Sequence, residues 1–174
     1  MPEARIAACH TLRTRSVLNG WHAAPMTTQA HADLLHSDNP RHTTRTYKGS
    51  CHCGAVRFEA RLDLGAGIGK CNCSICRRAN LLGAKVKPES MKILSGSDAL
   101  TDYQFNSNSV HHLFCKHCGV RPFGHANIPQ AGGEYYTVNV HCLEETAIAD
   151  LAGVPVKYYD GLHNNWWSDA TPFP

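Results

Sequence analysis

Seven of the nine cysteines fall into three short clusters at spacings typical of metal ligands. The clusters are Cys51-His52-Cys53, Cys71-Asn72-Cys73-Ser74-Ile75-Cys76 and Cys115-Lys116-His117-Cys118. A closed structural zinc takes four protein ligands, whereas a catalytic zinc takes three and keeps the fourth position for water or substrate. Because seven is four plus three, the sequence predicts two zinc ions per chain, one in a closed site and one in an open site.

The competing interpretation of so many cysteines is a disulfide framework. Such frameworks are typical of small secreted domains, and the sequence shows no signal-peptide pattern after Met1. A Cys-x-Cys disulfide would close a very small, strained ring. Zinc–sulfur bonds of about 2.3 Å place sulfurs about 3.8 Å apart, which residues of one turn can supply. We therefore favour metal. Cys9 and Cys142 stand outside the clusters, and we interpret them as a tail thiol and a buried small hydrophobic residue.

The chain of 174 residues divides into a leader and a domain. Residues 1–45 contain no lysine and show neither clean periodicity nor turn signals, so we predict a flexible N-terminal leader. Residues 46–174 are long enough for one sizeable core. No apolar run approaches the roughly 18 residues that span a membrane, and we expect a cytoplasmic protein. The alternative is organellar import, because Arg5, Arg13 and Arg15 faintly resemble a presequence.

From Thr46 onward, short alternating segments and frequent turns predict a mainly antiparallel β fold. In residues 55–61, apolar Val56, Phe58 and Ala60 alternate with charged residues, which is the period of a half-buried strand. Further strands are expected at residues 81–86, 91–94, 100–105, 110–114, 135–140 and 154–159. Only residues 74–79 and 143–147 favour helices.

The basic residues leave two interpretations open. Residues 46–174 carry twelve Lys or Arg against eleven Asp or Glu, so two zinc ions on seven thiolates would make this domain slightly negative. Six of the twelve bases nevertheless surround the middle cysteine cluster: Lys70, Arg77, Arg78, Lys85, Lys87 and Lys92. They form either a solvated face that offsets thiolate charge or an electropositive rim that attracts an anionic substrate.

Four segments carry a family resemblance, in this order: Gly49-Ser50-Cys51-His52-Cys53-Gly54-Ala55-Val56, Cys71-Asn72-Cys73-Ser74-Ile75-Cys76-Arg77-Arg78, Phe114-Cys115-Lys116-His117-Cys118-Gly119 and Val138-Asn139-Val140-His141-Cys142-Leu143. Over about residues 46–165 the sequence resembles the glutathione-dependent formaldehyde-activating enzyme family, also called the GFA or CENP-V domain family. The resemblance implies an Mss4-like (β-tent) fold of coiled antiparallel sheets pinned by zinc. It also implies a carbon–sulfur lyase activity that forms S-hydroxymethylglutathione from glutathione and formaldehyde.

Carried over by position, the family pattern implies a role for each cluster. The ligands of the closed structural zinc would be Cys51, Cys53, Cys115 and Cys118. The middle cluster would hold the catalytic zinc through Cys71, Cys73 and Cys76. A small thiol such as glutathione would bind at its open position as a thiolate and add to an aldehyde. Arg77 is interpreted as part of this site, and His125 is our choice for proton transfer ahead of His141 and Tyr103.

Two further groups of side chains have open interpretations. His52 and His117 lie inside cysteine pairs, and we expect them to point outward because the cysteines already complete the site. Trp166 and Trp167 either cover the mouth of the site or close the core under the last turn, and we favour the core.

Three classes of function are compatible with the clusters. The first is a zinc-dependent thiol lyase, the second is a non-catalytic zinc module for nucleic acid, chromatin or protein partners, and the third is a redox or metal-buffering protein. Single-strand binders normally place aromatic side chains among their basic residues. Residues 70–92 contain no aromatic residue, so nucleic acid is not the expected partner. The ordered spacing of the clusters argues against a buffer, and we predict the enzyme.

Overall fold

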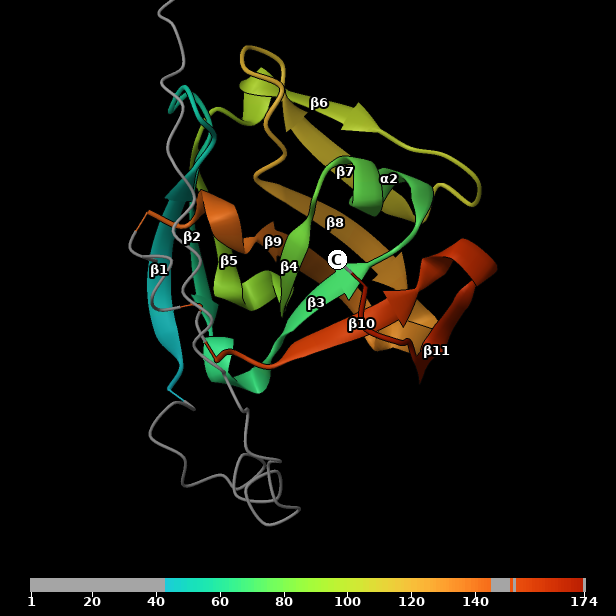
Figure 1. Ribbon diagram of the computed structural model, residues 1–174. Coiled ribbons are helices and arrows are strands. Elements are labelled where there is room, and N and C mark those ends of the chain that lie inside the picture. The colour runs from blue at the N-terminus through green and yellow to red at the C-terminus, as the bar shows by residue number, and fades with distance from the viewer. Residues whose placement is uncertain (1–42, 145–150, 152, 174) are drawn as a thin grey trace, which may run out of the picture. The chain divides into compact units, whose positions relative to one another are not determined.

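The computed structural model describes residues 43–144, 151 and 153–173, which form two β-sheets (Figure 1). A three-stranded sheet has the order β1-β2-β5, and an eight-stranded sheet has the order β11-β10-β3-β4-β9-β8-β7-β6. The strands are β1 (Arg45–Ser50), β2 (Arg57–Leu62), β3 (Ile68–Cys71), β4 (Leu82–Val86), β5 (Met91–Ser95), β6 (Leu100–Tyr103), β7 (Val110–Cys115), β8 (Phe123–Ile128), β9 (Gly133–Asn139), β10 (Val156–Asp160) and β11 (Asn165–Asp169). The prediction of a mainly β fold is confirmed.

The described helices are short. They are α2 (Ser74–Arg78) and the 3-10 helices η1 (Leu64–Ala66), η2 (Pro88–Ser90), η3 (Ser97–Ala99), η4 (Pro129–Ala131), η5 (Val140–Cys142) and η6 (Gly161–His163). In the part of the chain that the structure describes, no helix has the length and apolar character that crossing a membrane requires.

Strand pairing is antiparallel throughout these sheets except between β3 and β10, which run parallel. In this parallel pair Ile68 lies beside Val156, and Cys71 lies beside Tyr159. The pairing therefore brings the C-terminal strands to the start of the middle cysteine cluster.

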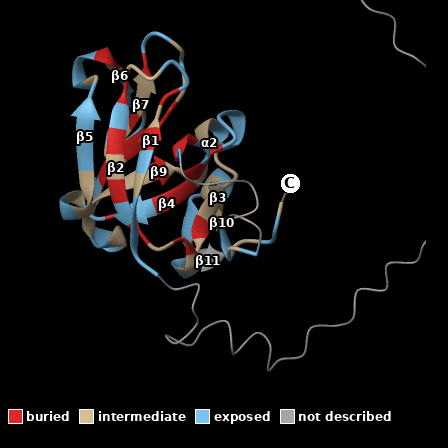
Figure 2. Ribbon diagram, turned by 90° about the vertical axis from the view of Figure 1, so that its left-hand side faces the viewer, coloured by how far each residue is buried: buried red, intermediate tan, exposed pale blue. Residues whose placement is uncertain are grey.

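The hydrophobic core lies between the two sheets. In β2 the side chains of Phe58, Ala60 and Leu62 are buried, while those of Arg57 and Arg61 are exposed. This alternation turns one face of the small sheet toward the large one. The ring of Phe58 meets that of Phe123 from β8 edge to face, with 5.3 Å between centroids. Figure 2 shows the buried residues along β2, β4 and β9.

The predicted elements agree with the structure in most places. The strands expected at residues 55–61, 81–86, 91–94, 100–105, 110–114, 135–140 and 154–159 correspond to β2, β4, β5, β6, β7, β9 and β10, and the helix expected at 74–79 corresponds to α2. Four strands were not predicted: β1, β3, β8 and β11. At the helix expected over 143–147, residues 143 and 144 form a bridge and a turn, and 145–147 lie outside the described residues.

The predicted leader lies almost entirely outside the described residues, which begin at Thr43. Strand β1 begins at Arg45, next to the predicted domain boundary at Thr46. The leader itself stays a prediction.

Candidate metal centres

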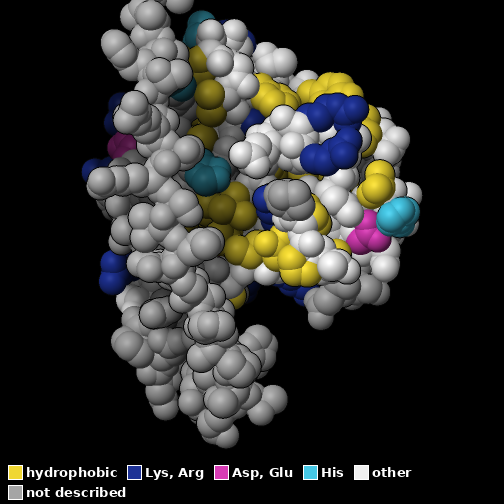
Figure 3. Space-filling model, viewed as in Figure 1, with side chains coloured by type: hydrophobic (Ala, Val, Ile, Leu, Met, Phe, Trp, Pro, Cys, Tyr) yellow, Lys and Arg dark blue, Asp and Glu magenta, His cyan; other side chains and the backbone are white. Residues whose placement is uncertain are grey.

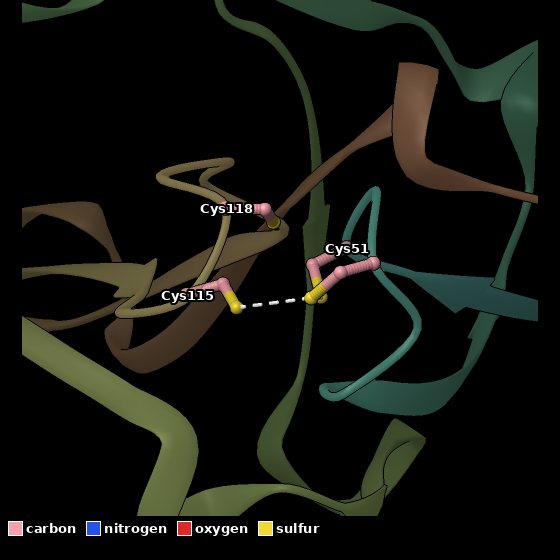
Figure 4. A group of neighbouring side chains, drawn as sticks. Cys51, Cys115 and Cys118 are labelled. Atoms are coloured by element: carbon pink, nitrogen blue, oxygen red, sulfur yellow. Dashed lines mark hydrogen bonds between the residues drawn. The ribbon is translucent and has the colours of Figure 1, made fainter.

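Four cysteines meet at one place, although they come from two separate turns. Cys51 and Cys53 lie between β1 and β2, whereas Cys115 ends β7 and Cys118 lies in the turn before β8. Their four sulfurs lie within 4.8 Å of one another, with 3.6 Å from Cys51 Sγ to Cys53 Sγ and 3.7 Å from Cys53 Sγ to Cys115 Sγ. Figure 4 shows the sulfurs of Cys51, Cys115 and Cys118 pointing toward one another. These spacings fit tetrahedral zinc, which needs about 3.8 Å.

The two turns of this group have closely similar backbones. The N–H of Cys51 donates to the carbonyl of Val56 at 3.0 Å, and the N–H of Cys115 donates to the carbonyl of Val120 at 2.9 Å. A glycine with a positive φ, +74° in one turn and +73° in the other, follows the second cysteine of each pair. Only glycine adopts this left-handed conformation at little cost. The two glycines are Gly54 and Gly119.

Cys71, Cys73 and Cys76 form the second group, and their sulfurs also lie within 4.8 Å of one another. Cys71 ends β3, Cys73 is the N-cap of α2, and Cys76 lies inside that helix. The N–H of Cys73 donates to Cys71 Sγ at 3.3 Å. The change from strand to helix within three residues folds the three thiols toward a common point.

These three thiols lie so close together that their pKa values differ widely. Hydrogen bonds from Cys71 and Cys76 lower the pKa of Cys73 far below its ordinary value. Hydrogen bonding with Cys73 raises the pKa of Cys71, and hydrogen bonding with Cys71 and Cys73, followed by burial, raises that of Cys76. One thiolate therefore forms readily and opposes the next two, so a cation is needed to keep all three ionised. This donor set fits Zn²⁺.

The first group also favours a bound cation, because backbone N–H groups stabilise the thiolate forms of its cysteines. Against the cost of burial, backbone N–H groups of Cys53 and Val120 lower the pKa of Cys118 to about 6. The N–H of Val56 donates to Cys51 Sγ at 3.3 Å. Peptide dipoles thus favour thiolates, the form in which cysteine binds a metal.

Asn72 ties the second group to the C-terminal strands. Its Nδ2 donates to Asp160 Oδ1 at 2.8 Å, and its Oδ1 accepts from the N–H of Leu162 at 2.8 Å. Its own N–H donates to the carbonyl of Tyr159 at 3.2 Å. Asn72 was not among the predicted site residues. Nothing in the sequence links it to Asp160, which lies 88 positions away.

Gly161 packs directly against the second group. A Cβ at this position would lie 2.8 Å from Cys71 Sγ, 2.7 Å from Cys73 Cβ and 2.4 Å from the ring of Trp166. Any side chain here would therefore displace the cysteines or the indole. Trp166 is 38% exposed and borders the site, so the prediction that it closes the core is wrong. The side chain of Trp167 lies outside the described residues.

A small pocket adjoins Cys71 and Cys76, and two of the six predicted rim bases, Lys70 and Arg77, line it. Figure 3 shows Lys and Arg side chains gathered over the region of α2. Phe173 from the C-terminal segment also lines the pocket. Among the described residues, the electropositive rim at this pocket consists of Lys70 and Arg77.

The other four predicted rim bases do not line this pocket. Lys85 Nζ lies 4.3 Å from the centroid of the Tyr135 ring and donates to the carbonyl of Ala131. Arg78 donates to the carbonyl of Ser74 at 2.9 Å. Lys87 is the N-cap of η2, and Lys92 lies in β5 of the small sheet.

Of the non-cysteine catalytic residues that we predicted, the structure brings Arg77 to the second group but not His125. His125 Nε2 lies 2.7 Å from Glu134 Oε1. Alternation along β8 places His125 on the same face of the sheet as Phe123, which belongs to the core. The alternative candidates are His141, exposed in η5, and Tyr103, exposed in β6.

Two buried basic side chains near the second group were missed by the sequence analysis. Arg121 is 6% exposed and His112 is 4% exposed. Burial lowers the pKa of Arg121, while Cys76 and Cys73 act in the opposite direction because both lie near it. Burial and then the charge of Arg121 lower the pKa of His112 to about 4. The pattern Val120-Arg121-Pro122 gives no sign that this arginine is buried.

The cysteines outside the two groups and the histidines inside the cysteine pairs remain to be placed. Cys142 is buried, as expected, and its Sγ donates to the carbonyl of Arg121 at 3.9 Å. His52 and His117 are exposed, as expected. Cys9 lies outside the described residues.

Residues 46–156 match a family model described as glutathione-dependent formaldehyde-activating enzyme. Among solved structures, the chain is similar to a Rhodobacter sphaeroides protein known from a crystal structure. The two share 36% sequence identity, with a TM-score of 0.55, over 63% of this chain and 98% of that chain.

Proposed function

The chain belongs to the family of glutathione-dependent formaldehyde-activating enzymes, and on this basis we propose that it is a zinc-dependent carbon–sulfur lyase that joins a small thiol to an aldehyde. The family's description gives glutathione and formaldehyde as the reactants. One observation carries the proposal. Four sulfurs form one group and three sulfurs form another, so a tetrahedral metal is complete in the first and has one free position in the second.

The two groups divide the metal chemistry between them. The ligands of the structural zinc would be Cys51, Cys53, Cys115 and Cys118, and those of the catalytic zinc would be Cys71, Cys73 and Cys76. When bound at the second group, zinc supplies the positive charge that keeps a substrate thiol in its thiolate form.

The protein's own residues would shape the second site. Asn72 fixes the loop between the ligands through Asp160 and Leu162, and Gly161 leaves the space that a side chain would fill. Lys70 and Arg77 line the pocket beside the sulfurs and would attract the carboxylates of glutathione.

The reaction itself makes one bond and moves one proton. The thiolate sulfur forms a bond to the aldehyde carbon, and the π pair of the C=O bond moves onto the oxygen. That oxygen then takes a proton, equal to the one that the thiol released, and a hydroxymethyl thioether leaves. We place this chemistry in the cytoplasm, where glutathione is reduced and cysteines stay free.

The test is metal analysis of the full-length protein followed by a rate measurement. We expect two zinc ions per chain and a saturable acceleration of S-hydroxymethylglutathione formation above the spontaneous rate, measured by exchange NMR. Cys73→Ser should retain one zinc and lose the acceleration. A fully metallated wild-type protein that accelerates addition of neither glutathione nor cysteine to formaldehyde would contradict the proposal and favour the non-catalytic zinc module.

A further inference from the structure

Arg121 connects the two cysteine groups. Its backbone follows the turn that carries Cys115 and Cys118, and its carbonyl accepts from Asn139 Nδ2 at 3.2 Å. Its guanidinium, by contrast, lies near Cys76 and Cys73 of the second group, both of which act to raise its pKa against the effect of burial. The turn of the first group therefore positions the backbone of a residue whose charged end lies near the second group.

A glycine in the sheet makes room for this guanidinium. A Cβ on Gly124 of β8 would lie 2.5 Å from Arg121 Nη2 and 3.4 Å from its Cζ. Gly124 pairs with His112 across β7 and β8, and His112 is buried. Alternation places Gly124 on the face opposite Phe123 and the core. The guanidinium thus packs over the backbone of Gly124, on the side of the sheet away from the core.

Not every N–H donor of this guanidinium has a hydrogen-bond acceptor among the described residues. Arg121 Nε and Nη1 are buried and have no hydrogen-bond partner among the described residues, and the same holds for His112 Nδ1. Buried charged donors rarely stay unpaired, because leaving them so costs their full desolvation. An acceptor from outside the chain is therefore expected here. Because Cys76 and Cys73 are neighbours of the guanidinium, this acceptor would lie beside the second group.

We propose that Arg121 binds the aldehyde oxygen and stabilises the negative charge that this oxygen gains when the thiolate adds. The inference rests on the proposed function and names a further catalytic residue for it. The sulfur–carbon bond forms as the C=O π bond breaks, the electron pair goes to the oxygen beside the guanidinium, and a proton from solvent completes the hydroxyl group. A buried donor that is already in place needs no reorganisation as the charge develops.

The competing role for Arg121 is that of a counter-ion for the cysteine thiolates. The two roles differ in what the guanidinium touches. A counter-ion favours every thiolate ligand alike, whereas an oxygen-binding group favours only ligands that carry an oxygen one carbon away from sulfur. Thioacetate has that oxygen, as the hydroxymethyl product does, and ethanethiol does not.

The experiment compares the affinities of thioacetate and ethanethiol for the cobalt-substituted second centre, read from its visible spectrum. In Arg121→Met, which keeps an unbranched apolar stem but removes the guanidinium, we expect the preference for thioacetate over ethanethiol to fall by about 10- to 100-fold relative to wild type. Arg77→Met, on the exposed side of the same centre, should leave that preference unchanged. Equal weakening of both ligands by Arg121→Met would show a counter-ion and overturn the inference.

A second measurement needs no substitution and covers the case in which Arg121→Met does not fold. The infrared C=O stretch of ¹³C-labelled thioacetate on the wild-type cobalt protein should lie below its frequency on a small cobalt thiolate complex, because a hydrogen bond to oxygen weakens that bond. An unshifted stretch overturns the inference alone. A centre that binds neither thiol overturns the proposed function as well, which separates the two failures.

Discussion

The two cysteine groups use the same side chain for different structural purposes. The first joins a turn of the small sheet to a turn of the large sheet, and Cys51 and Cys115 in it are each 1% exposed. The second lies where β3 passes into α2, and all three of its cysteines are half-buried. A metal in the first group would therefore fasten the two layers of the domain, whereas the second group is a local feature at the end of an interior strand of the large sheet.

The difference predicts unequal consequences when a group is lost. Cys53 and Cys115 are 62 positions apart, so a metal between them closes a long loop and stabilises the packing of two sheets. Binding of structural zinc contributes about 10–16 kcal/mol in zinc-finger peptides at neutral pH, as much as the whole stability of many domains. The second group closes no such loop, because its members lie within six consecutive residues.

The largest effect is expected for Cys115→Ser. Losing one of four ligands between the sheets should lower the free energy of unfolding by about 4 kcal/mol or more and leave a protein that is insoluble or melts without a cooperative transition. Thermal melting and zinc analysis check this. Cys142→Ala is the matched control, because Cys142 is buried but belongs to neither group. If Cys115→Ser melts like this control, the first group does not hold the sheets together.

The next effect is expected for Cys73→Ser, which should remove one metal without unfolding the protein. Its zinc content should fall from two to one per chain, the melting temperature should change by a few degrees, and thiol addition should stop. In the wild type, a mild chelator should withdraw this same zinc first, since the second group offers three cysteine ligands and the first offers four. Loss of both metals together in either experiment would show that the two groups are coupled rather than independent.

A smaller effect is expected for Asn72→Ala. This change removes the two hydrogen bonds to Asp160 and Leu162 but no ligand. Partners that orient a metal ligand typically contribute 10- to 100-fold in metal affinity, so we expect a loss of about that size at the second site alone, measured by competition with a coloured chelator. Asn127→Ala, on an exposed part of β8, is the control. Unchanged affinity would show that the C-terminal strands do not support the site.

The same contrast explains which parts of the site the sequence could predict. Ligand spacing is local information, so the cysteine clusters were visible as short motifs, and the alternation of β2 was visible for the same reason. Arg121 and Asn72 gain their roles from contacts across the fold, with Cys76 in one case and Asp160 in the other. No pattern in the sequence marks such pairs.

The missed strands have a similar explanation. In β3 the sequence Ile68-Gly69-Lys70-Cys71 contains a glycine, which normally weakens a strand, and the structure uses it for close approach to the ring of Tyr159, 2.8 Å from its missing Cβ. In β8, Gly124 likewise leaves room for the Arg121 guanidinium, which a side chain at this position would displace. His125 was chosen as a catalytic residue by type, although its strand position turns it to the core face.

The smallest effect is expected at the rim of the second site. Arg77 is exposed beside Cys71 and Cys76, whereas Lys85 is held against Tyr135 and the carbonyl of Ala131. Arg77→Ala should therefore weaken glutathione binding to the cobalt-substituted protein by about 2- to 5-fold at low salt, since exposed charge pairs contribute little. Lys85→Ala should have a smaller effect. The bases of the predicted rim would then contribute unequally to glutathione binding.

Salt and ligand charge make this prediction specific to electrostatics. The effect of Arg77→Ala on glutathione should vanish near 0.5 M salt, because ions screen charges beyond about 4 Å at that strength. It should also be absent for ethanethiol, which carries no carboxylate. A loss that persists at high salt, or that is equal for both thiols, would mean that Arg77 shapes the centre itself rather than attracting the ligand by its charge.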